Sequence, residues 1–279
     1  MPANNDFKKN GYKIYKNSLD KSYHEELFFL FYDLSLSIIK NNALKPNFDI
    51  PKNIKYNKKD LKILDRILIF ILTCNNKLIG EIYDTIAYTS IFLRLVSDIN
   101  IENKSRELLG LRKRTPLYSW THRIRIDPPR DSRRTYGWHQ EIFYTPLESK
   151  FLQTWYPVIR DANFENGTIE ICPKSHKKKI ADQYWTEKPG RANQIIVNPK
   201  IVEKYKPKII NMKLNSVLFF DPHLFHRSGN NTSDEIRFSV VGMLNDATSN
   251  KFKAPIPSFE PRTITPKKRY ERFFKRKVI

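Results

Sequence analysis

Residues 118–126, with the sequence YSWTHRIRI, mark the point at which the chain changes from a helical pattern to a strand-like one. Apolar or aromatic residues, with one histidine, alternate here with Ser119, Thr121, Arg123 and Arg125. Successive side chains of a β-strand point to opposite faces, so this alternation predicts a strand with one apolar and one polar face.

Before this point the sequence predicts helices. Ser22 and Glu25 have the spacing of a capping box, and apolar residues follow them at helical intervals. A second helix is expected to begin near Asp60 and to end at the breaker Asn75-Asn76. A third is expected to continue from there as far as Val96.

After this point the sequence predicts short strands, most of them separated by Pro or Gly. The further candidates are residues 137–144, 151–159, 168–172, 208–212, 216–220 and 236–244. Helices first and strands afterwards indicate an α+β fold, with a mostly antiparallel sandwich or barrel backed by helices. For 279 residues we expect a single domain, 1–279, with a helical region (1–103), a β core (104–250) and a basic tail (251–279).

The composition is strongly basic. With 50 Lys and Arg against 29 Asp and Glu, the formal net charge is +21. A positive field raises the association rate of anionic partners of any kind, which favours an anionic or carrier-linked small-molecule substrate. It also leaves open a non-catalytic basic β-barrel module that binds nucleic acid or an acidic glycan. The tail segment KKRYERFFKRK (267–277) is either solvated or a contact for such a partner.

The sequence favours a cytoplasmic protein without a membrane span. The longest apolar run, ILIFILT at 67–73, is far shorter than the ~20 residues that a bilayer requires. Two cysteines, Cys74 and Cys172, are too few for a disulfide scaffold and suit a reducing compartment. The sequence does not indicate an oligomeric state.

One group of residues predicts metal chemistry. His139 and Glu141 are two apart, so on a strand they would project to the same side and could chelate one ion. A second histidine from another strand, His226, would complete a set of two imidazoles and one carboxylate, which is typical of non-haem Fe(II) oxygenases. His223 is the alternative for this second histidine. Phosphate-loop, dinucleotide-binding, zincin and hydrolase-elbow motifs are absent from the sequence.

Arg237 supports the same hypothesis. It is the only charged residue between Ile236 and Leu244, and a buried guanidinium needs an anion nearby. The distal carboxylate of a dicarboxylate cosubstrate could be that anion, because it can accept a bidentate pair of hydrogen bonds. The alternative is that Arg237 reaches solvent or pairs with an acidic residue elsewhere.

From about Trp120 to Leu244 the chain resembles the phytanoyl-CoA dioxygenase family of Fe(II)- and 2-oxoglutarate-dependent oxygenases. The residues that carry the resemblance, in matching order and spacing, are Arg125-Ile-Asp127, Trp138-His-Gln-Glu141, Trp155, Asn166-Gly-Thr-Ile-Glu-Ile-Cys-Pro-Lys-Ser-His176, Phe219-Phe-Asp221, His226-Arg-Ser-Gly-Asn230 and Arg237.

The resemblance implies a double-stranded β-helix (jelly roll) with helices packed on one sheet. It implies iron ligation by His139, Glu141 and His226, and contacts of Arg237 and Ser228 with the distal carboxylate of 2-oxoglutarate. Trp155 falls where the family has an aromatic residue near the cosubstrate, and Arg125 is a further candidate for binding the cosubstrate or an anionic substrate. The implied reaction uses O2 and hydroxylates a small molecule with release of succinate and CO2.

Two positions depart from the family pattern. Glu141 stands where the family usually has Asp, but it keeps the charge and hardness of the ligand. It also argues against halogenation, because halogenating relatives leave that coordination position open for chloride. Lys174 stands where the family usually has Gly, which affects the expected geometry of the turn.

Overall fold

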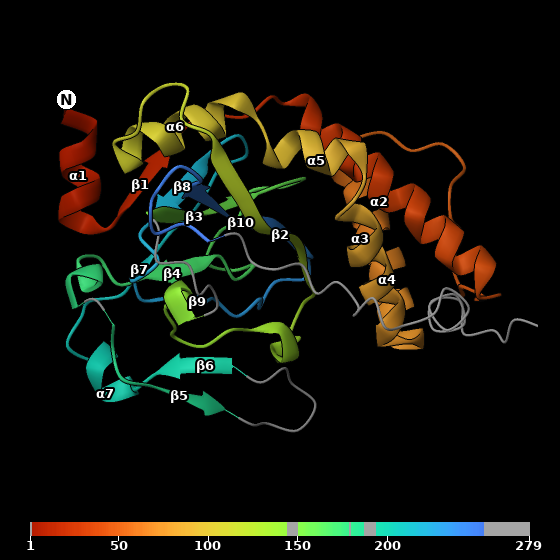
Figure 1. Cartoon of the computed structure of the whole chain (residues 1–279). Coiled ribbons are helices and arrows are strands. Elements are labelled where there is room, and N and C mark those ends of the chain that lie inside the picture. The colour runs from red at the N-terminus through yellow and green to blue at the C-terminus, as the bar shows by residue number, and fades with distance from the viewer. Residues whose placement is uncertain (1, 144–149, 179, 187–193, 254–279) are drawn as a thin grey trace, which may run out of the picture.

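The computed structural model describes residues 2–143, 150–178, 180–186 and 194–253. Its centre is a pair of facing antiparallel sheets, and most helices cover the outer face of the larger one (Figure 1). The helices described up to residue 109 are α1 (Pro2–Asn10), α2 (Ser22–Asn41), α3 (Lys58–Cys74), α4 (Asn76–Ile86), α5 (Ser90–Val96) and α6 (Ile99–Leu109).

Asparagine side chains fix two of the helix starts. Asn57 Oδ1 accepts a hydrogen bond from the backbone N–H of Asp60 and caps α3. Asn75 ends α3 and its side chain caps α4, as the Asn75-Asn76 breaker predicts. The prediction of a capping box at Ser22 is wrong, because Ser22 is already the first residue of α2. The residue before it, Lys21, makes no side-chain capping hydrogen bond. The third expected helix is two helices, α4 and α5, because the chain turns between Ile86 and Ser90.

The larger sheet has five strands in the order β1-β8-β3-β10-β2. Their bounds are β1 (Tyr12–Tyr15), β8 (Val217–Phe220), β3 (Phe151–Pro157), β10 (Arg237–Asp246) and β2 (Leu117–Asp127). The strand β2 contains residues 118–126, and Ile124 and Ile126 pack into the helical core. Phe238 on β10 contacts Phe31 on α2 from the same face, with ring centroids 5.0 Å apart. The register of β2 with β10 shifts between Val241 and Met243, so Tyr118 and Trp120 lie on the opposite face, and the prediction of one continuous apolar face is wrong there.

The smaller sheet has the order β7-β4-β9, with β7 (Lys208–Ile209), β4 (Ile169–Ile171) and β9 (His226–Ser228). An antiparallel bridge between His139 and His226 adds one more segment beside β9. A second core lies between the two sheets and includes Trp155, Leu218 and Phe220 from one sheet and Ile169 and Ile171 from the other. Two facing sheets with helices on one of them confirm the α+β, double-stranded β-helix prediction.

Between β4 and β7 the chain adds a small outer unit. It contains the hairpin β5 (Gln183–Thr186) and β6 (Gln194–Val197) and the short helix α7 (Pro199–Val202), which lie below the smaller sheet in Figure 1. The hairpin touches the core segment directly, because the Val197 N–H donates to the Trp138 carbonyl. None of these three elements was expected from the sequence pattern.

A buried ion pair joins the helices to the sheet. Arg160, just after β3, donates from Nη1 to Asp65 Oδ2 of α3 at 2.9 Å, and both side chains are almost fully buried. Burial raises the pKa of Asp65 to about 6, although Arg160 opposes the shift.

Two predicted boundaries, the end of the helical region at residue 103 and the start of the basic tail at residue 251, can be compared with the structure. Helix α6 extends to Leu109, so the helices continue past residue 103. Most of the basic tail, from residue 254 onward, lies outside the described residues. Within the described part of the chain, no helix is both long and apolar enough to cross a membrane.

Candidate metal centre

His139, Glu141 and His226 come together in the structure. Glu141 Oε2 lies 3.8 Å from His139 Nε2 and 3.6 Å from His226 Nε2. The three candidate ligand atoms all lie within 4.8 Å of one another. Three donors at these separations can bind one metal ion from one side.

The backbone explains how the residues meet. The N–H groups of His139 and His226 each donate to the other's carbonyl, which holds the two imidazoles side by side. The prediction of a strand over 137–144 is wrong, because the chain turns after Gln140 into a 3-10 helix, Glu141–Phe143. The carboxylate of Glu141 therefore reaches the imidazoles through this turn and not through strand alternation.

Both histidines present the correct nitrogen to a metal. His139 Nδ1 lies 2.7 Å from the Gly137 carbonyl oxygen, and His226 Nδ1 lies 2.9 Å from that of Leu224. A carbonyl only accepts hydrogen bonds, so each Nδ1 carries a proton, and Nε2 is the nitrogen left to ligate a metal. Burial and the neighbouring imidazole of His226 lower the pKa of His139 well below its usual value, which keeps it in the neutral, ligating form.

Gln140 connects the two ligand segments. Its side chain is fully buried and donates to the His223 carbonyl at 2.6 Å. Its Oε1 accepts from the Ala181 N–H and from Gln183 Nε2. The alternative ligand His223 is not part of the cluster, because its Nδ1 lies 2.9 Å from Asp221 Oδ1.

Arg237 is buried but has an acidic partner. Its Nη2 donates to Asp127 Oδ2 at 2.7 Å, because Arg237 on β10 is in register with Asp127 on β2. The alternative that Arg237 pairs with an acidic residue outside its own strand is therefore confirmed. Its Nε and Nη1 are buried without a hydrogen-bond partner among the described residues, so it can still donate to a further anion.

Asp127 is shared by two arginines. Arg125 donates to it from Nε at 3.2 Å and from Nη2 at 2.7 Å. Burial alone would raise the pKa of Asp127, but the guanidiniums of Arg125 and Arg237 hold it well below its ordinary value. The resulting cluster carries two positive charges and one negative charge, which suits one additional carboxylate.

The other predicted cosubstrate residues, Ser228, Trp155 and Arg125, lie on β9, β3 and β2. Ser228 follows His226 by two residues on β9, so both project to the same face, and its N–H donates to the Tyr136 carbonyl. Trp155 on β3 is buried between the sheets. The Arg125 guanidinium lies 5.4 Å from the ring centroid of Tyr136, whose ring is 5.6 Å from that of His139.

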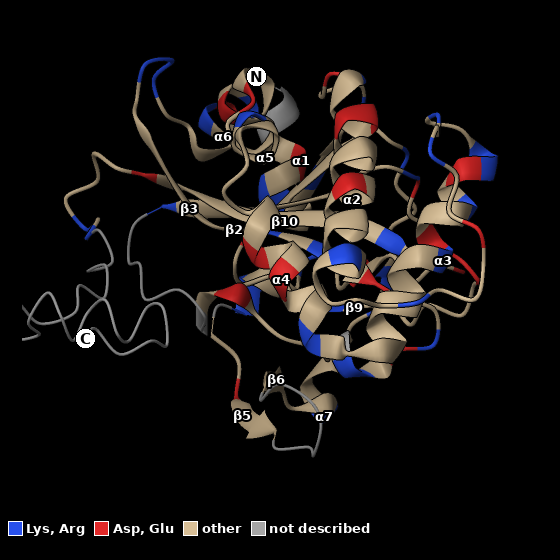
Figure 2. Ribbon diagram, turned by 90° about the vertical axis from the view of Figure 1, so that its right-hand side faces the viewer, with Lys and Arg blue, Asp and Glu red and all other residues tan. Residues whose placement is uncertain are grey.

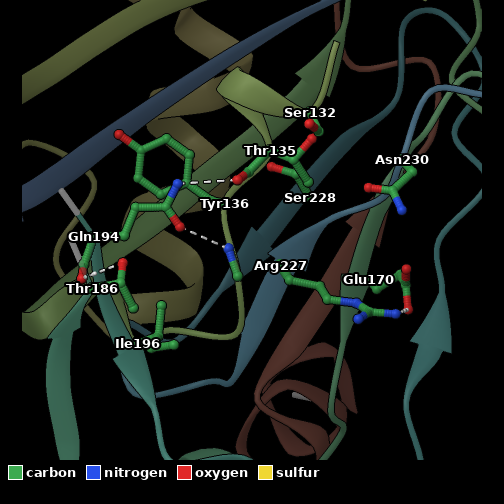
Figure 3. Close-up of a pocket in the computed structure, with 11 residues that line it drawn as sticks. Ser132, Thr135, Tyr136, Glu170, Thr186, Gln194, Ile196, Arg227, Ser228 and Asn230 are labelled. Atoms are coloured by element: carbon green, nitrogen blue, oxygen red, sulfur yellow. Dashed lines mark hydrogen bonds and ion pairs between the residues drawn. The ribbon is translucent and has the colours of Figure 1, made fainter. Parts of the chain in front are cut away.

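A cavity of about 360 Å³ borders this region (Figure 3). Ser228 and Tyr136 belong to its lining, together with the ion pair between Arg227 and Glu170 at 2.9 Å and with Gln194 of β6. Gln194 holds the 135–137 segment, because it accepts from the Gly137 N–H and donates to the Thr135 carbonyl. Sequence reasoning gave no role to Glu170, Arg227 or Gln194, although Glu170 and Arg227 lie within the segments that carry the family resemblance.

Two turns near the site have left-handed backbone. Gly167 has φ of 80°, and a Cβ there would lie 2.7 Å from the backbone of Asn230 and Asn231. Only glycine allows the turn to approach the end of β9 so closely. Lys174 has φ of 70°, so the turn keeps the geometry that favours glycine although a lysine occupies it.

Comparisons with known proteins agree with this fold and this site. Residues 83–239, more than half of the chain, match the model of the family described as phytanoyl-CoA dioxygenase (PhyH). The chain belongs to this family, whose enzymes are Fe(II)- and 2-oxoglutarate-dependent oxygenases that use O2. The donor set of His139, Glu141 and His226 fits iron, and the unpaired Arg237 donors fit a carboxylate of 2-oxoglutarate.

Individual relatives are distant. The ectoine dioxygenase of Streptomyces coelicolor is 24% identical over 223 residues, which cover 69% of this chain and 70% of the relative. The human peroxisomal phytanoyl-CoA dioxygenase is 23% identical over 124 residues, which cover 43% of this chain and 37% of the relative.

Solved structures show the same fold at low identity. EctD from S. alaskensis has a TM-score of 0.56 at 16% identity, covering 92% of this chain and 80% of that one. The epimerase SnoN, in complex with Fe3+, alpha ketoglutarate and nogalamycin RO, has a TM-score of 0.55 at 16% identity, covering 88% and 83%.

Proposed function

We propose that this protein is an Fe(II)- and 2-oxoglutarate-dependent dioxygenase that hydroxylates a small molecule and releases succinate and CO2. The observation that carries the proposal is the convergence of His139, Glu141 and His226, with both imidazoles fixed so that Nε2 faces the shared point. We place the reaction in the cytoplasm, in keeping with Cys74 and Cys172, which form no disulfide.

In this proposal each residue of the site has one role. His139, Glu141 and His226 hold Fe(II), and Arg237 and Ser228 receive the distal carboxylate of 2-oxoglutarate. The bound metal and cosubstrate supply the oxidising chemistry by activating O2. The protein binds, orients and shields them: Trp155 excludes water from between the sheets, and Arg125 fixes Asp127 against Arg237.

Hydroxylation is the outcome that we favour. The Streptomyces relative is named as a dioxygenase, whereas SnoN is named as an epimerase. Glu141 occupies the coordination position that halogenation would need for chloride, which supports transfer of oxygen over halogenation. An epimerisation or ring closure would use the same residues and would differ in the product.

The charge of the chain does not favour the nucleic-acid alternative. Figure 2 shows Lys and Arg interspersed with Asp and Glu along α3, and not gathered into one continuous stripe in that view. A stripe of one sign is the usual footprint of a nucleic-acid surface. The expectation of an anionic substrate rests on the net charge and not on contacts at the metal centre.

The test is anaerobic binding of Fe(II) and 2-oxoglutarate, followed through the metal-to-ligand charge-transfer band. We expect the band in the wild type and in His223→Ala, which changes a histidine outside the cluster, and its loss in His226→Ala. A wild-type protein that gives no band and binds neither component would refute the proposal.

A further inference from the structure

A row of side chains on the inner face of the larger sheet leads from the metal centre to Gln153. On β3, Gln153 is in register with Phe220 of β8 and with Met243 of β10. Side chains of directly opposed residues project to the same face of a sheet. Phe220 belongs to the core between the sheets, and its ring centroid lies 4.7 Å from that of His226. Gln153 therefore faces the barrel interior beside a ring that touches a candidate ligand.

Asn245 lies next to Gln153 on the same face. It follows Met243 by two residues on β10 and is in register with Phe151 of β3. The alternate residues Phe238, Val240 and Leu244 face the helices, so Asn245 must face the interior. The two carboxamides are diagonal neighbours across β3 and β10, a separation of roughly 7–8 Å that one small ligand can span.

Neither carboxamide has all of its hydrogen bonds satisfied by the described residues. Gln153 is 4% exposed and Asn245 is fully buried. Gln153 Oε1 and Asn245 Oδ1 have no hydrogen-bond partner among the described residues, and Asn245 Nδ2 reaches only the Tyr118 carbonyl at 3.4 Å. A buried amide without a partner destabilises a fold, and an apolar side chain of equal size would not. Buried polar atoms without hydrogen-bond partners are expected at functional sites, where a bound ligand can supply the missing partner.

The side chains of Gln153 and Asn245 carry no charge. A carboxamide offers neutral donors and acceptors, whereas the inward guanidiniums of Arg125 and Arg237 are paired with Asp127. We propose that Gln153 and Asn245 form a substrate subsite that recognises an uncharged hydroxyl or amide group. This inference rests on the proposed function and names the substrate class that the net charge alone would not suggest.

The first test needs no substrate. Gln153→Met and Asn245→Leu keep the approximate volume of each side chain and remove its unpaired oxygen. We therefore expect the apparent melting temperature to rise by about 2–4 °C, the shift that a gain of about 1 kcal/mol gives for a chain of this size. The matched control is Asn231→Leu. Asn231 is also buried, but its amide donates to the carbonyls of Asp127 and Glu235 and accepts from the Ser233 N–H, so this substitution should lower the melting temperature. A drop in both test variants that matches the control would assign the pair a structural role and overturn the inference.

The second test measures succinate release above the uncoupled rate. The probes are the uncharged N-acetylglucosamine, which carries an amide, and myo-inositol, which carries only hydroxyls, against the anionic glucuronate and glucose 6-phosphate. We expect at least one uncharged probe to stimulate the wild type, and Gln153→Met to lose at least ten-fold of that stimulation while keeping the charge-transfer band. Stimulation by anionic probes alone, no stimulation by either uncharged probe, or full stimulation in the variant would overturn the inference. Absence of the band in the wild type would instead reject the proposed function.

Discussion

Asp127→Asn tests the charge cluster on which cosubstrate binding is proposed to depend. The substitution keeps the size of the side chain but removes the negative charge between Arg125 and Arg237, whose Nη2 atoms lie 2.7 Å from the carboxylate oxygens. The Arg237 side chain is only 3% exposed, so its charge would be left buried without a counter-ion. Removing one partner of a buried pair typically costs about 3–5 kcal/mol, and we expect a loss of this size in the free energy of unfolding.

The assay is urea unfolding at neutral pH, repeated with saturating 2-oxoglutarate and Fe(II) under anaerobic conditions. A ligand that binds only the folded state stabilises it. Because the distal carboxylate would supply the charge that Asp127 no longer provides, 2-oxoglutarate should stabilise the variant more than the wild type. The pH dependence should also change. The lowered pKa of Asp127 means that its contribution is present above the unfolded value of about 3.9 and is lost as the pH falls further. The variant should therefore lose less stability than the wild type on acidification.

The control is Asp234→Asn, which removes the partner of Arg130 in an exposed pair at 3.0 Å. Exposed pairs contribute about 0–1 kcal/mol, so this variant should unfold near the wild-type midpoint. If Asp127→Asn is as stable as Asp234→Asn, the buried cluster does not stabilise the fold and the reasoning fails. If 2-oxoglutarate stabilises Asp127→Asn no more than the wild type, Arg237 does not receive the cosubstrate.

Three further variants probe other features. Arg160→Met leaves Asp65 buried without its partner and should lower the free energy of unfolding by about 3–5 kcal/mol at pH 8. The loss should be smaller at pH 5, because Asp65, whose pKa is already raised to about 6, is then protonated. Equal losses at both pH values in urea unfolding would contradict this. Gly167→Ala places a Cβ 2.7 Å from the backbone of Asn230 and Asn231 and should lower the melting temperature. It should also lower the affinity for 2-oxoglutarate, measured by titration of the charge-transfer band. The control Gly80→Ala, with open space at that position, should lower neither. Glu141→Asp restores the usual residue of the family and should keep the charge-transfer band, whereas Glu141→Ala should lose it; a band of wild-type intensity in Glu141→Ala would show that this carboxylate is not a ligand.

The sequence predicted the fold where a pattern extends over many residues. The alternation at 118–126 predicts β2 because Ile124 and Ile126 pack against helices and must be apolar. The strands β1 and β9 have four and three residues, too few to show a period, so they could be found only from their pairing. The left-handed Thr121 that interrupts β2 (φ 52°) gave no signal either.

The site was predictable in its chemistry but not in its contacts. Residue types and spacing indicate His139, Glu141 and His226 as ligands, and the structure places them together, although a turn and not a strand delivers Glu141. The partner of Arg237 depends on the register between β10 and β2, which a sequence does not display. The unpaired oxygens of Gln153 and Asn245 likewise appear only once the faces of β3 and β10 are known.

The strand β1 has a practical consequence for handling the protein. It pairs along the outer edge of β8, and Tyr12 lies opposite Phe220, the residue that touches His226. A deletion of the first sixteen or so residues would expose the backbone of β8 as a free edge, which invites pairing between separate copies. Shortened versions of this chain should therefore aggregate more readily, so purification tags should be added to the first residues and not put in their place.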